Sequence, residues 1–420
     1  MNLRRAIPYS CLFALLAACT NEQRSDVGAG GGAGTSESTG STSAVTGTSA
    51  GNGGSGGSGG NGGSGGGSGG SGGSGDVPPP EPEEVPVLEN ITFYDGYAAT
   101  VDEPIPDGVI RHNNSLVATR LTDELLAKVQ TTLKVRVVVG ALCDNYDRLG
   151  SVNLALVPKG AQTYVSGDVE RIEVARFVTP FMNMNKQPTT VPYEWEASNL
   201  VPILKDPDLL AEHDFWLELS IFGVPYAAND EVAGCAGRND TQLGSLLLYT
   251  DSTQEAQDFS VLLPLAIGEE FNNYAVGASD RVGTTRKTVS FELPADTQNA
   301  QLVLITSNHG ANQGGEEYIR REHHVYVDGK LALQYKPGRT SCEPFRRYNT
   351  QSNGIYGRSP LSDEEWQSFS NWCPGDVIDT RIVPWGAASA GAHEFVIDVP
   401  DATFVDGQGN FPFSLYVQAQ

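Results

Sequence analysis

The stretch Val325-Tyr326-Val327-Asp328-Gly329-Lys330-Leu331-Ala332-Leu333 has the pattern of a β-hairpin. Two runs of largely apolar residues flank an Asp-Gly pair, which tolerates the positive φ angles of a tight turn. Outward from this hairpin, similar short runs predict strands at residues 131–139, 151–157, 170–178, 215–222, 245–249, 260–265, 288–293, 300–306, 377–383, 394–399 and 411–417. Helix signals are few, at residues 122–128, 206–212 and 362–367. The chain is therefore expected to be all-β, built of antiparallel sandwiches or jelly rolls.

The N-terminus has the form of an export signal. Met1-Asn2-Leu3-Arg4-Arg5 precedes a short apolar run and Leu16-Ala17-Ala18-Cys19, which resembles a bacterial lipobox. We expect residues 1–18 to be a signal peptide and Cys19 to be lipidated. The alternative is an ordinary signal peptide followed by an incidental cysteine. The expected protein is exported across the inner membrane and held at the outer membrane or cell surface, with the lipid anchor as its only membrane contact.

Composition divides the rest of the chain. Residues 19–87 are Gly- and Ser-rich and then Pro-rich, so we expect a disordered tether that cannot bury apolar surface. The remaining residues are more than a single hydrophobic core usually contains, so we expect two domains, at 88–257 and 258–420. The formal charge of −24 disfavours nucleic acid as a partner.

Four of the six cysteines lie beyond the signal and the expected lipidation site. In an oxidising compartment they are expected to form disulfides, and four cysteines allow three pairings. We favour Cys342–Cys373, which closes a Pro- and Asn-rich loop, together with Cys143–Cys235. The absence of a C-x-x-C pair disfavours structural zinc.

Two short clusters carry the polar chemistry, Cys143-Asp144-Asn145-Tyr146-Asp147-Arg148 and Gly314-Gly315-Glu316-Glu317-Tyr318-Ile319-Arg320-Arg321-Glu322-His323. Each combines carboxylates, arginine and an aromatic residue near an expected strand. Aromatic rings stack on sugars, arginine binds oxygen, and carboxylates perform acid–base chemistry. The alternatives are a simple Asp147–Arg148 ion pair and a solvated Glu–Arg cluster. Both clusters in one cleft would indicate an enzyme acting on glycans.

Four motifs, taken in order, resemble those of the peptide-N-glycosidase F family. The first cluster is similar to the family's Cys-Asp-Glu-Trp-Asp-Arg, and Ala175-Arg176-Phe177-Val178-Thr179-Pro180-Phe181 to its Gly-Arg-Phe-Ile-Thr-Pro-Tyr. Glu317-Tyr318 with Arg321-Glu322-His323 resembles its Glu-Trp and Arg-Thr-His. Trp372-Cys373-Pro374-Gly375 with Thr380-Arg381-Ile382 matches its Trp-Cys-Pro-Gly and Thr-Arg-Ile. The resemblance implies two adjacent eight-stranded antiparallel jelly rolls with the active site between them, a fold shared with peptidylglycine monooxygenases.

The resemblance also implies an activity and a site. The activity is hydrolysis of the glycosyl-asparagine amide bond of N-glycosylated proteins or glycopeptides, without cofactor or metal, by a monomer. It would release the glycan and leave aspartate. Asp147 and Glu317 match the family's catalytic carboxylates. Substrate binding is expected of the residues around them, namely Arg148, Tyr146, Tyr318, His309 and Trp372.

The sequence departs from the family at several points. Phe222 stands where the family has a third acidic residue, and Asp214 and Glu218 flank that position. The family's disulfide around the second carboxylate is missing, because Gly315 and Ile319 replace its cysteines. Cys143 also lacks its near partner in the family, which supports pairing it with Cys235. An insertion at residues 224–242 is expected near the cleft.

Other interpretations stay open. Trp372 could instead pack against the Cys342–Cys373 disulfide. His309 could instead be a histidine in a turn at the surface, without a role in the cleft. Two further functions share the fold. One is a non-catalytic lipoprotein that binds glycans or glycopeptides. The other is a copper monooxygenase, suggested by His323-His324 but disfavoured because the chain has only six histidines.

Overall fold

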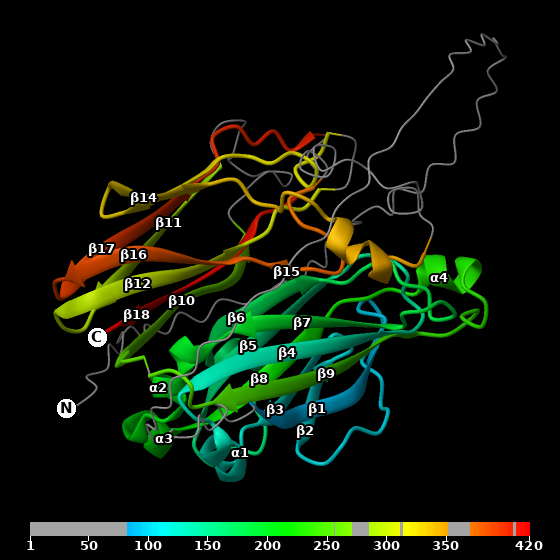
Figure 1. The fold of residues 1–420 in the computed structure, drawn as a ribbon, viewed down its shortest axis with the longest axis horizontal. Coiled ribbons are helices and arrows are strands. Elements are labelled where there is room, and N and C mark those ends of the chain that lie inside the picture. Colours follow the sequence, from blue (N-terminus) through cyan, green and yellow to red (C-terminus); the bar gives the residue numbers. More distant parts are fainter. Residues whose placement is uncertain (1–81, 256, 271–284, 311–313, 352–369, 406–408) are drawn as a thin grey trace, which may run out of the picture. The chain divides into compact units, whose positions relative to one another are not determined.

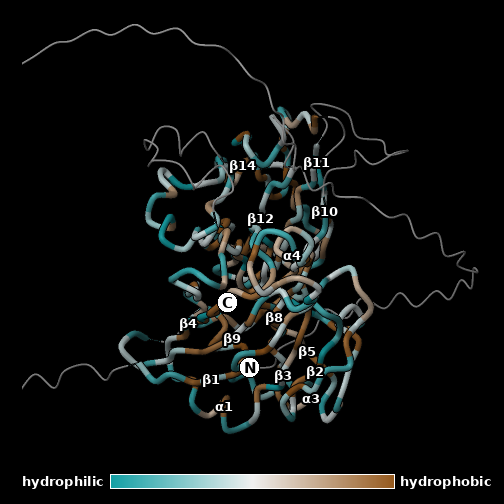
Figure 2. Tube along the Cα trace, turned by 90° about the vertical axis from the view of Figure 1, so that its right-hand side faces the viewer, coloured by the Kyte–Doolittle hydropathy of each residue, from teal (hydrophilic) through white to brown (hydrophobic). Residues whose placement is uncertain are grey.

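The computed structural model describes residues 82–255, 257–270, 285–310, 314–351, 370–405 and 409–420. The expected signal peptide, Cys19, most of the tether and the helix expected at residues 362–367 lie outside these ranges. The described chain is built of antiparallel strands in four sheets, and it runs from blue to red through them in Figure 1. Apolar segments follow the strands (Figure 2). The all-β expectation is confirmed.

The first sandwich packs a four-stranded sheet against a six-stranded sheet. In the smaller sheet the order is β1 (Glu83–Tyr94), β9 (Asp240–Asp251), β4 (Thr132–Ala141) and β7 (Thr190–Glu196). In the larger it is β15 (Val377–Ile378), β6 (Glu170–Val178), β5 (Leu149–Pro158), β8 (His213–Ile221), β3 (Leu116–Arg120) and β2 (Val109–Asn113). The short helices are α1 (Asp123–Lys128), α2 (Val201–Leu204), α3 (Pro207–Glu212) and α4 (Tyr226–Glu231). Side chains from both sheets share one apolar core.

The second sandwich has two four-stranded sheets. One has the order β10 (Val261–Glu270), β18 (Pro412–Ala419), β12 (Thr297–Thr306) and β16 (Thr380–Ala388). The other has the order β11 (Arg286–Leu293), β17 (Gly391–Asp398), β13 (His323–Val327) and β14 (Lys330–Tyr335). This half has the eight strands that the resemblance implied. The first half differs, because nine strands of its own, β1 to β9, and the borrowed β15 form its sheets within the described residues.

The hairpin that indicated the fold forms as expected. β13 pairs with β14, and Val327 stands opposite Lys330 across the turn. Asp328 and Gly329 have φ angles of 49° and 73°, the left-handed values that favour an Asp-Gly turn. The Asp328 carboxylate also accepts a hydrogen bond from the backbone N–H of Glu394 at 3.1 Å, which ties the turn to the neighbouring strand β17.

One boundary has to be corrected. β1 begins at Glu83, inside the 19–87 stretch expected to be tether. Val85 and Leu88 are each 2% exposed, so this part of the Pro-containing segment is a strand that faces the core. The expected strand at 377–383 is also divided, since β15 joins the first sandwich and β16 the second.

Buried polar contacts join the two sandwiches. Arg176 on β6 is 2% exposed and forms a bidentate pair with Glu173, with nitrogen–oxygen distances of 2.7 and 2.6 Å. A third nitrogen of Arg176 donates to Ser307 Oγ and to the Pro412 carbonyl, each at 2.9 Å. This arginine belongs to the Arg-Phe-Val-Thr-Pro motif, which therefore carries a structural contact between the halves.

Candidate active site

The loop between β4 and β5 carries the first predicted cluster, and its shape depends on Asp144. The Asp144 carboxylate accepts hydrogen bonds from Tyr146 N at 3.0 Å, Arg148 Nε at 2.7 Å and Val224 N at 2.8 Å. Arg148 therefore pairs with Asp144, and the alternative of a simple Asp147–Arg148 ion pair is not what the structure shows. Of the two carboxylates in this loop, Arg148 forms its ion pair with Asp144 and not with Asp147.

Thr179, the residue after β6, holds the same loop through hydrogen bonds. Its hydroxyl accepts a hydrogen bond from Arg148 N at 2.7 Å and donates to the Tyr146 carbonyl at 3.2 Å. Its own backbone N–H donates to the Arg148 carbonyl at 2.7 Å. The second motif of the resemblance therefore holds the first in place.

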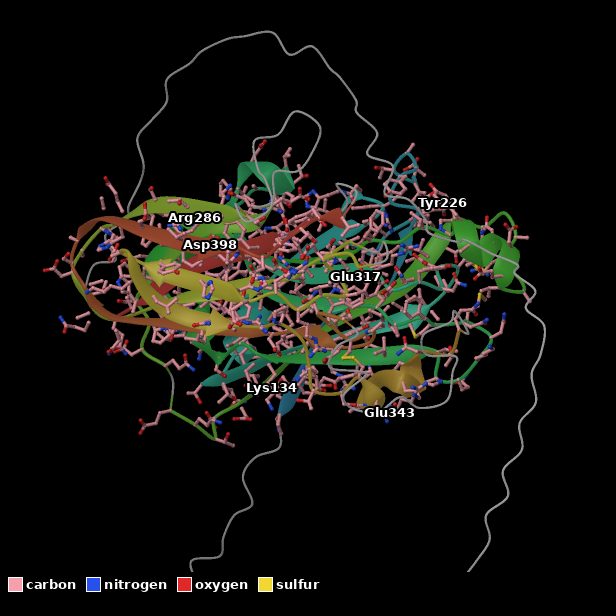
Figure 3. All side chains as sticks on the ribbon, turned by 90° about the horizontal axis from the view of Figure 1, so that it is seen from above. Lys134, Tyr226, Arg286, Glu317, Glu343 and Asp398 are labelled. Atoms are coloured by element: carbon pink, nitrogen blue, oxygen red, sulfur yellow. A yellow bond between two sulfur atoms is a disulfide. The ribbon has the colours of Figure 1, made fainter. Side chains whose placement is uncertain are left out.

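Glu317 lies between β12 and β13, in the second sandwich. Asn371, next to the Trp-Cys-Pro-Gly motif, donates its backbone N–H to the Glu317 carbonyl at 2.9 Å, and its side-chain amide to the same oxygen at 2.8 Å. Glu316, the residue before Glu317, has no exposed surface. Its carboxylate accepts hydrogen bonds from Arg321 Nε at 2.9 Å and from the backbone N–H of Phe404 at 3.1 Å. The alternative of a solvated Glu–Arg cluster is thus excluded for Glu316, which forms a buried pair with Arg321. Figure 3 labels Glu317 among the side chains seen from above.

The structure brings the two predicted catalytic carboxylates together from different sandwiches. Removal of surrounding water raises the pKa of Glu317 to about 8, and the charge of Asp147 adds to this increase. Desolvation likewise raises the pKa of Asp147 to about 7, against the opposing effect of the Arg148 charge. Two carboxylates that titrate near neutrality are matched to accepting and donating protons at physiological pH.

Tyr318 and Tyr146 lie beside these carboxylates, as expected. A hydrogen bond from Tyr318 stabilises the Glu317 carboxylate. Burial raises the pKa of Tyr318, and the charges of Glu317 and Asp147 add to this increase. The Arg148 guanidinium lies 5.5 Å from the centre of the Tyr146 ring. The structure thus groups Asp147, Arg148, Tyr146, Glu317 and Tyr318.

Trp372 does not present its ring to a ligand. It is 6% exposed, packs with Val178, Ile305 and Ile378, and donates its indole N–H to the Asn308 carbonyl at 3.3 Å. The expectation of substrate binding by this residue is therefore corrected to packing, in the apolar joint between the sandwiches. It is Phe181, with the half-buried Tyr146, that packs against the Cys342–Cys373 disulfide.

His309 lines a cavity of about 390 Å³ together with Arg171, Arg176 and Asn410. Its ring nitrogen bonds Ser307 Oγ at 2.8 Å, and burial lowers its pKa to about 3, so the imidazole is neutral at pH 7. Asp147 and Glu317 do not line this cavity. His309 lies near the site through Gly310, whose carbonyl accepts the Glu317 N–H at 3.4 Å.

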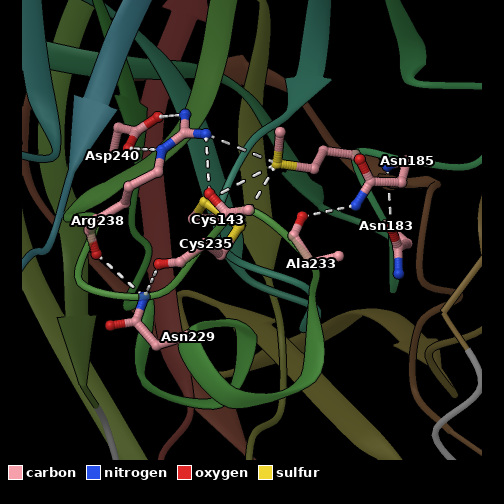
Figure 4. The surroundings of a disulfide bond; sticks show 10 residues. Cys143, Asn183, Asn185, Asn229, Ala233, Cys235, Arg238 and Asp240 are labelled. Carbon is pink, nitrogen blue, oxygen red and sulfur yellow. Dashed lines mark hydrogen bonds and ion pairs between the residues drawn. A yellow bond between two sulfur atoms is a disulfide. The ribbon is translucent and has the colours of Figure 1, made fainter.

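Both favoured disulfides are present, Cys143–Cys235 and Cys342–Cys373. Cys143–Cys235 connects the start of the Asp147 loop to the insertion, with Arg238 beside it (Figure 4). The sulfur of Met184 contacts both cysteine sulfurs. Within the insertion, α4 carries Glu231, which accepts a hydrogen bond from the buried Asn145 side chain at 2.7 Å. The charge of Glu231 also contributes to a raised pKa of Tyr146, after burial. The insertion therefore borders the site, as its position predicted.

The two acidic residues that flank Phe222 in the sequence are both held in other contacts. Glu218 has no exposed surface and binds Asn153, Ser166 and Arg171 on the larger sheet. Asp214 pairs with Lys159 at 3.0 Å. Sequence reasoning missed four residues that hold the loops of the site in place, Asp144, Thr179, Asn371 and Glu231. The first three lie in or beside the matched motifs, and this position was the signal that could have identified them.

The histidine pair does not form a metal site. His323 has no exposed surface and bonds the Arg321 carbonyl at 3.0 Å, whereas His324 takes the opposite face of β13. Among the described residues, no group of three or more His, Cys, Asp or Glu side chains could hold a metal ion.

The helices of the described chain are all short, and none of them has the length and apolar character of a membrane span.

The comparisons with known proteins match both halves of the chain. A family model described as peptide-N-glycosidase F, N terminal, matches residues 84–236, and one described as peptide-N-glycosidase F, C terminal, matches residues 278–418. A solved structure of PNGF-II is 22% identical with a TM-score of 0.58, over 81% of this chain and 66% of that one. The chain thus spans about two thirds of that relative.

A second structure, PNGase F, a glycosylasparaginase from Flavobacterium meningosepticum, is 16% identical with a TM-score of 0.51, over 81% of this chain and 96% of that one. At these identities the structures establish the shared double-sandwich fold. No curated protein matches the chain. Because the two family models follow one another over both sandwiches, the chain belongs to the peptide-N-glycosidase F family.

Proposed function

We propose that this protein is a peptide-N-glycosidase that hydrolyses the glycosyl-asparagine amide bond of N-glycosylated proteins or glycopeptides. The observation that carries the proposal is the pairing of Asp147 and Glu317 across the two sandwiches, with both pKa values raised toward neutrality. Membership of the family supports the reaction class.

In the proposed reaction, Asp147 in its ionised form takes a proton from water as the water oxygen attacks the side-chain carbonyl carbon of the glycosylated asparagine. The bond between this carbon and the amide nitrogen then breaks, and protonated Glu317 supplies the proton that the leaving nitrogen needs. The products are a peptide aspartate and a glycosylamine. Arg148 stays fixed by Asp144 at 2.7 Å, so its remaining N–H groups are oriented to stabilise negative charge developing on the carbonyl oxygen.

The proposal includes placement outside the cell. Cys19, as the lipidated residue of an exported protein, would hold the sandwiches on a tether at the outer membrane or cell surface, and a monomer would suffice for the reaction. The lipid anchor and the location rest on the N-terminal sequence alone. Metabolic labelling with a radioactive fatty acid, in the native protein and in Cys19→Ala, tests them: label that persists in the variant excludes the lipobox.

Heavy-oxygen labelling tests the reaction. Full-length protein is incubated with a denatured N-glycoprotein in water enriched in ¹⁸O, and the peptides are analysed by mass spectrometry. We expect glycan release with one ¹⁸O atom in each new aspartate, and loss of this product in Asp147→Asn. Unlabelled asparagine at the sites of release would mean that the sugar–nitrogen bond breaks instead, which would exclude the amidase.

One observation favours a second function. The resemblance implies that Phe222 stands where the family has a third acid, and the nearby carboxylates of Glu218 and Asp214 are held in other contacts. A glycan-binding protein without activity would show no release in ¹⁸O water, yet it would retain glycopeptide. Restoration of activity by Phe222→Glu would then identify the lost acid as the cause.

A further inference from the structure

Two exposed tyrosines stand beside the Asp147 loop without a role in the proposed chemistry. Tyr97 is 59% exposed and Tyr226, the first residue of α4, is 55% exposed, among the most exposed large apolar side chains that the structure describes. Figure 3 labels Tyr226. Aromatic rings left in water at this level often mark a surface that binds a ligand.

Phe222 supports the Tyr97 ring from one side. The two ring centres are 5.3 Å apart in an edge-on arrangement. Gly96 makes this contact possible, because a Cβ atom at that position would lie 2.6 Å from the Phe222 ring. The backbone N–H of Gly96 also donates to the Gly223 carbonyl at 2.9 Å, which holds the two segments together. Phe222 is thus the fixed base on which Tyr97 rests.

The same segments are attached to the catalytic loop. Phe222 N donates to the Leu149 carbonyl at 3.2 Å, two residues beyond Asp147. Val224 N donates at 2.8 Å to Asp144, which also holds Arg148. We call Tyr97, Phe222 and Tyr226 the Tyr97 platform. Its position is therefore fixed relative to Asp147 and Arg148.

Polar groups accompany the rings. The Asp95 carboxylate accepts hydrogen bonds from Tyr97 N at 3.0 Å and from the Tyr226 hydroxyl at 3.5 Å. A phenol and a carboxylate next to exposed ring faces match the two sides of a pyranose, whose C–H groups stack on aromatic rings and whose hydroxyls donate to oxygen. An apolar peptide side chain would use the ring faces alone, whereas a sugar also offers hydroxyl groups to the polar atoms beside them.

We propose that the Tyr97 platform binds a pyranose ring of the glycan, beyond the sugar attached to asparagine, through stacking on Tyr97 and hydrogen bonding to the Asp95–Tyr226 pair. The inference rests on the proposed function, because it takes the substrate to be a glycan at Asp147. Phe222 then has a positive role: it replaces an acid with the support for a stacking residue.

Glycan binding is measured separately from hydrolysis. Full-length Asp147→Asn is titrated by calorimetry with a free high-mannose N-glycan, and then with the unglycosylated peptide. In this background Tyr97→Ala is expected to weaken glycan binding about tenfold, the size of a lost stacking contact. Tyr97→Phe is expected to retain the affinity, since it keeps the ring. Leu331→Ala, at a 54% exposed position on β14, is the matched control and should change nothing.

The outcomes separate the two proposals. Tyr97-dependent glycan binding in a protein that releases no glycan would support the platform and refute the amidase. Normal release with unchanged glycan affinity in both Tyr97→Ala and Tyr226→Ala would refute the platform and leave the amidase intact. Loss of peptide binding in place of glycan binding would make the platform a peptide site and also refute the proposal. Thermal melting of each variant shows that the sandwiches remain folded.

Discussion

Glu316 and Glu317 are adjacent in the chain and have opposite electrostatic surroundings. Burial acts to raise the pKa of Glu316, but hydrogen bonds from Arg321, Thr403 and Phe404 outweigh it and lower the pKa. Within the described part of the chain no arginine forms such a pair with Glu317, and desolvation together with the charge of Asp147 raises its pKa. One residue therefore stabilises the fold as an anion, and the other is suited to hold a proton.

At the same scale, the stability of the two glutamates should depend on pH in opposite ways. The folded state holds a proton on Glu317 that the unfolded chain loses above about pH 4.3, so stability from this group falls as pH rises toward about 8. Glu317→Gln should therefore raise the melting temperature at pH 8.5 and have little effect at pH 4.5. Glu316→Gln should lower it at pH 8.5, because the lowered pKa of Glu316 makes the anion stabilising. Calorimetric melting at both pH values checks this, and shifts of the same sign in both variants would contradict it.

The catalytic assignment gives a second residue-scale prediction. In the proposed reaction Asp147 is ionised and Glu317 is protonated, so kcat/KM should rise with pH through about 7 and fall through about 8. Asp147→Asn should reduce kcat about 10²- to 10⁴-fold, the usual contribution of a general base. In Glu317→Gln the alkaline decrease should disappear. Initial rates on a glycopeptide from pH 5 to 10 test this, and an alkaline decrease retained in Glu317→Gln would assign the acid elsewhere.

At the scale of elements, strong local patterns predicted most strands and the weak patterns failed. β1, β2, β3 and β7 were not predicted. β2 and β3 are only five residues long, and β1 contains two glutamates and a proline in its first four residues. β1, β3 and β7 pair with the stronger strands β9, β8 and β4, and β2 pairs with β3 at the edge of its sheet. These strands therefore form through their neighbours and not because of their own alternation.

The β13–β14 hairpin provides an element-scale prediction. Gly329 has a φ of 73°, so Gly329→Ala should cost about 1 kcal/mol of unfolding free energy, as a Cβ is disfavoured in the left-handed region. Gly167 is the control, since it has no atoms within 4 Å of its virtual Cβ and no positive φ. Gly167→Ala is expected to be neutral or to add about 0.4–1 kcal/mol. Denaturant titration measures both, and equal effects would argue against a left-handed turn.

At the scale of the whole molecule, the site exists only where the two sandwiches meet. Asp147 and Glu317 come from different halves, and buried Arg176 connects those halves through Glu173, Ser307 and Pro412. A change in this joint would therefore alter the distance between the carboxylates without touching either of them.

Arg176→Met should lower the unfolding free energy by about 3–5 kcal/mol, because it leaves the Glu173 carboxylate buried without a partner. The double variant Arg176→Met/Glu173→Leu should recover most of this stability, since no buried charge remains. If the joint also positions the site, kcat/KM stays low in the double variant although the fold is restored. Denaturant unfolding and glycopeptide kinetics are measured on both, and full recovery of kcat/KM would confine Arg176 to stability.

The sequence by itself determined the fold class, the hairpin and the two clusters that hold the proposed catalytic carboxylates, because these follow from local periodicity, turn chemistry and motif order. The tertiary structure decided which charges are paired. Arg148 binds Asp144 and not Asp147, Trp372 is buried in the joint, and Tyr97 rests on Phe222. Such choices depend on burial and on contacts between segments far apart in the chain, and these distances are set only when the two sandwiches pack.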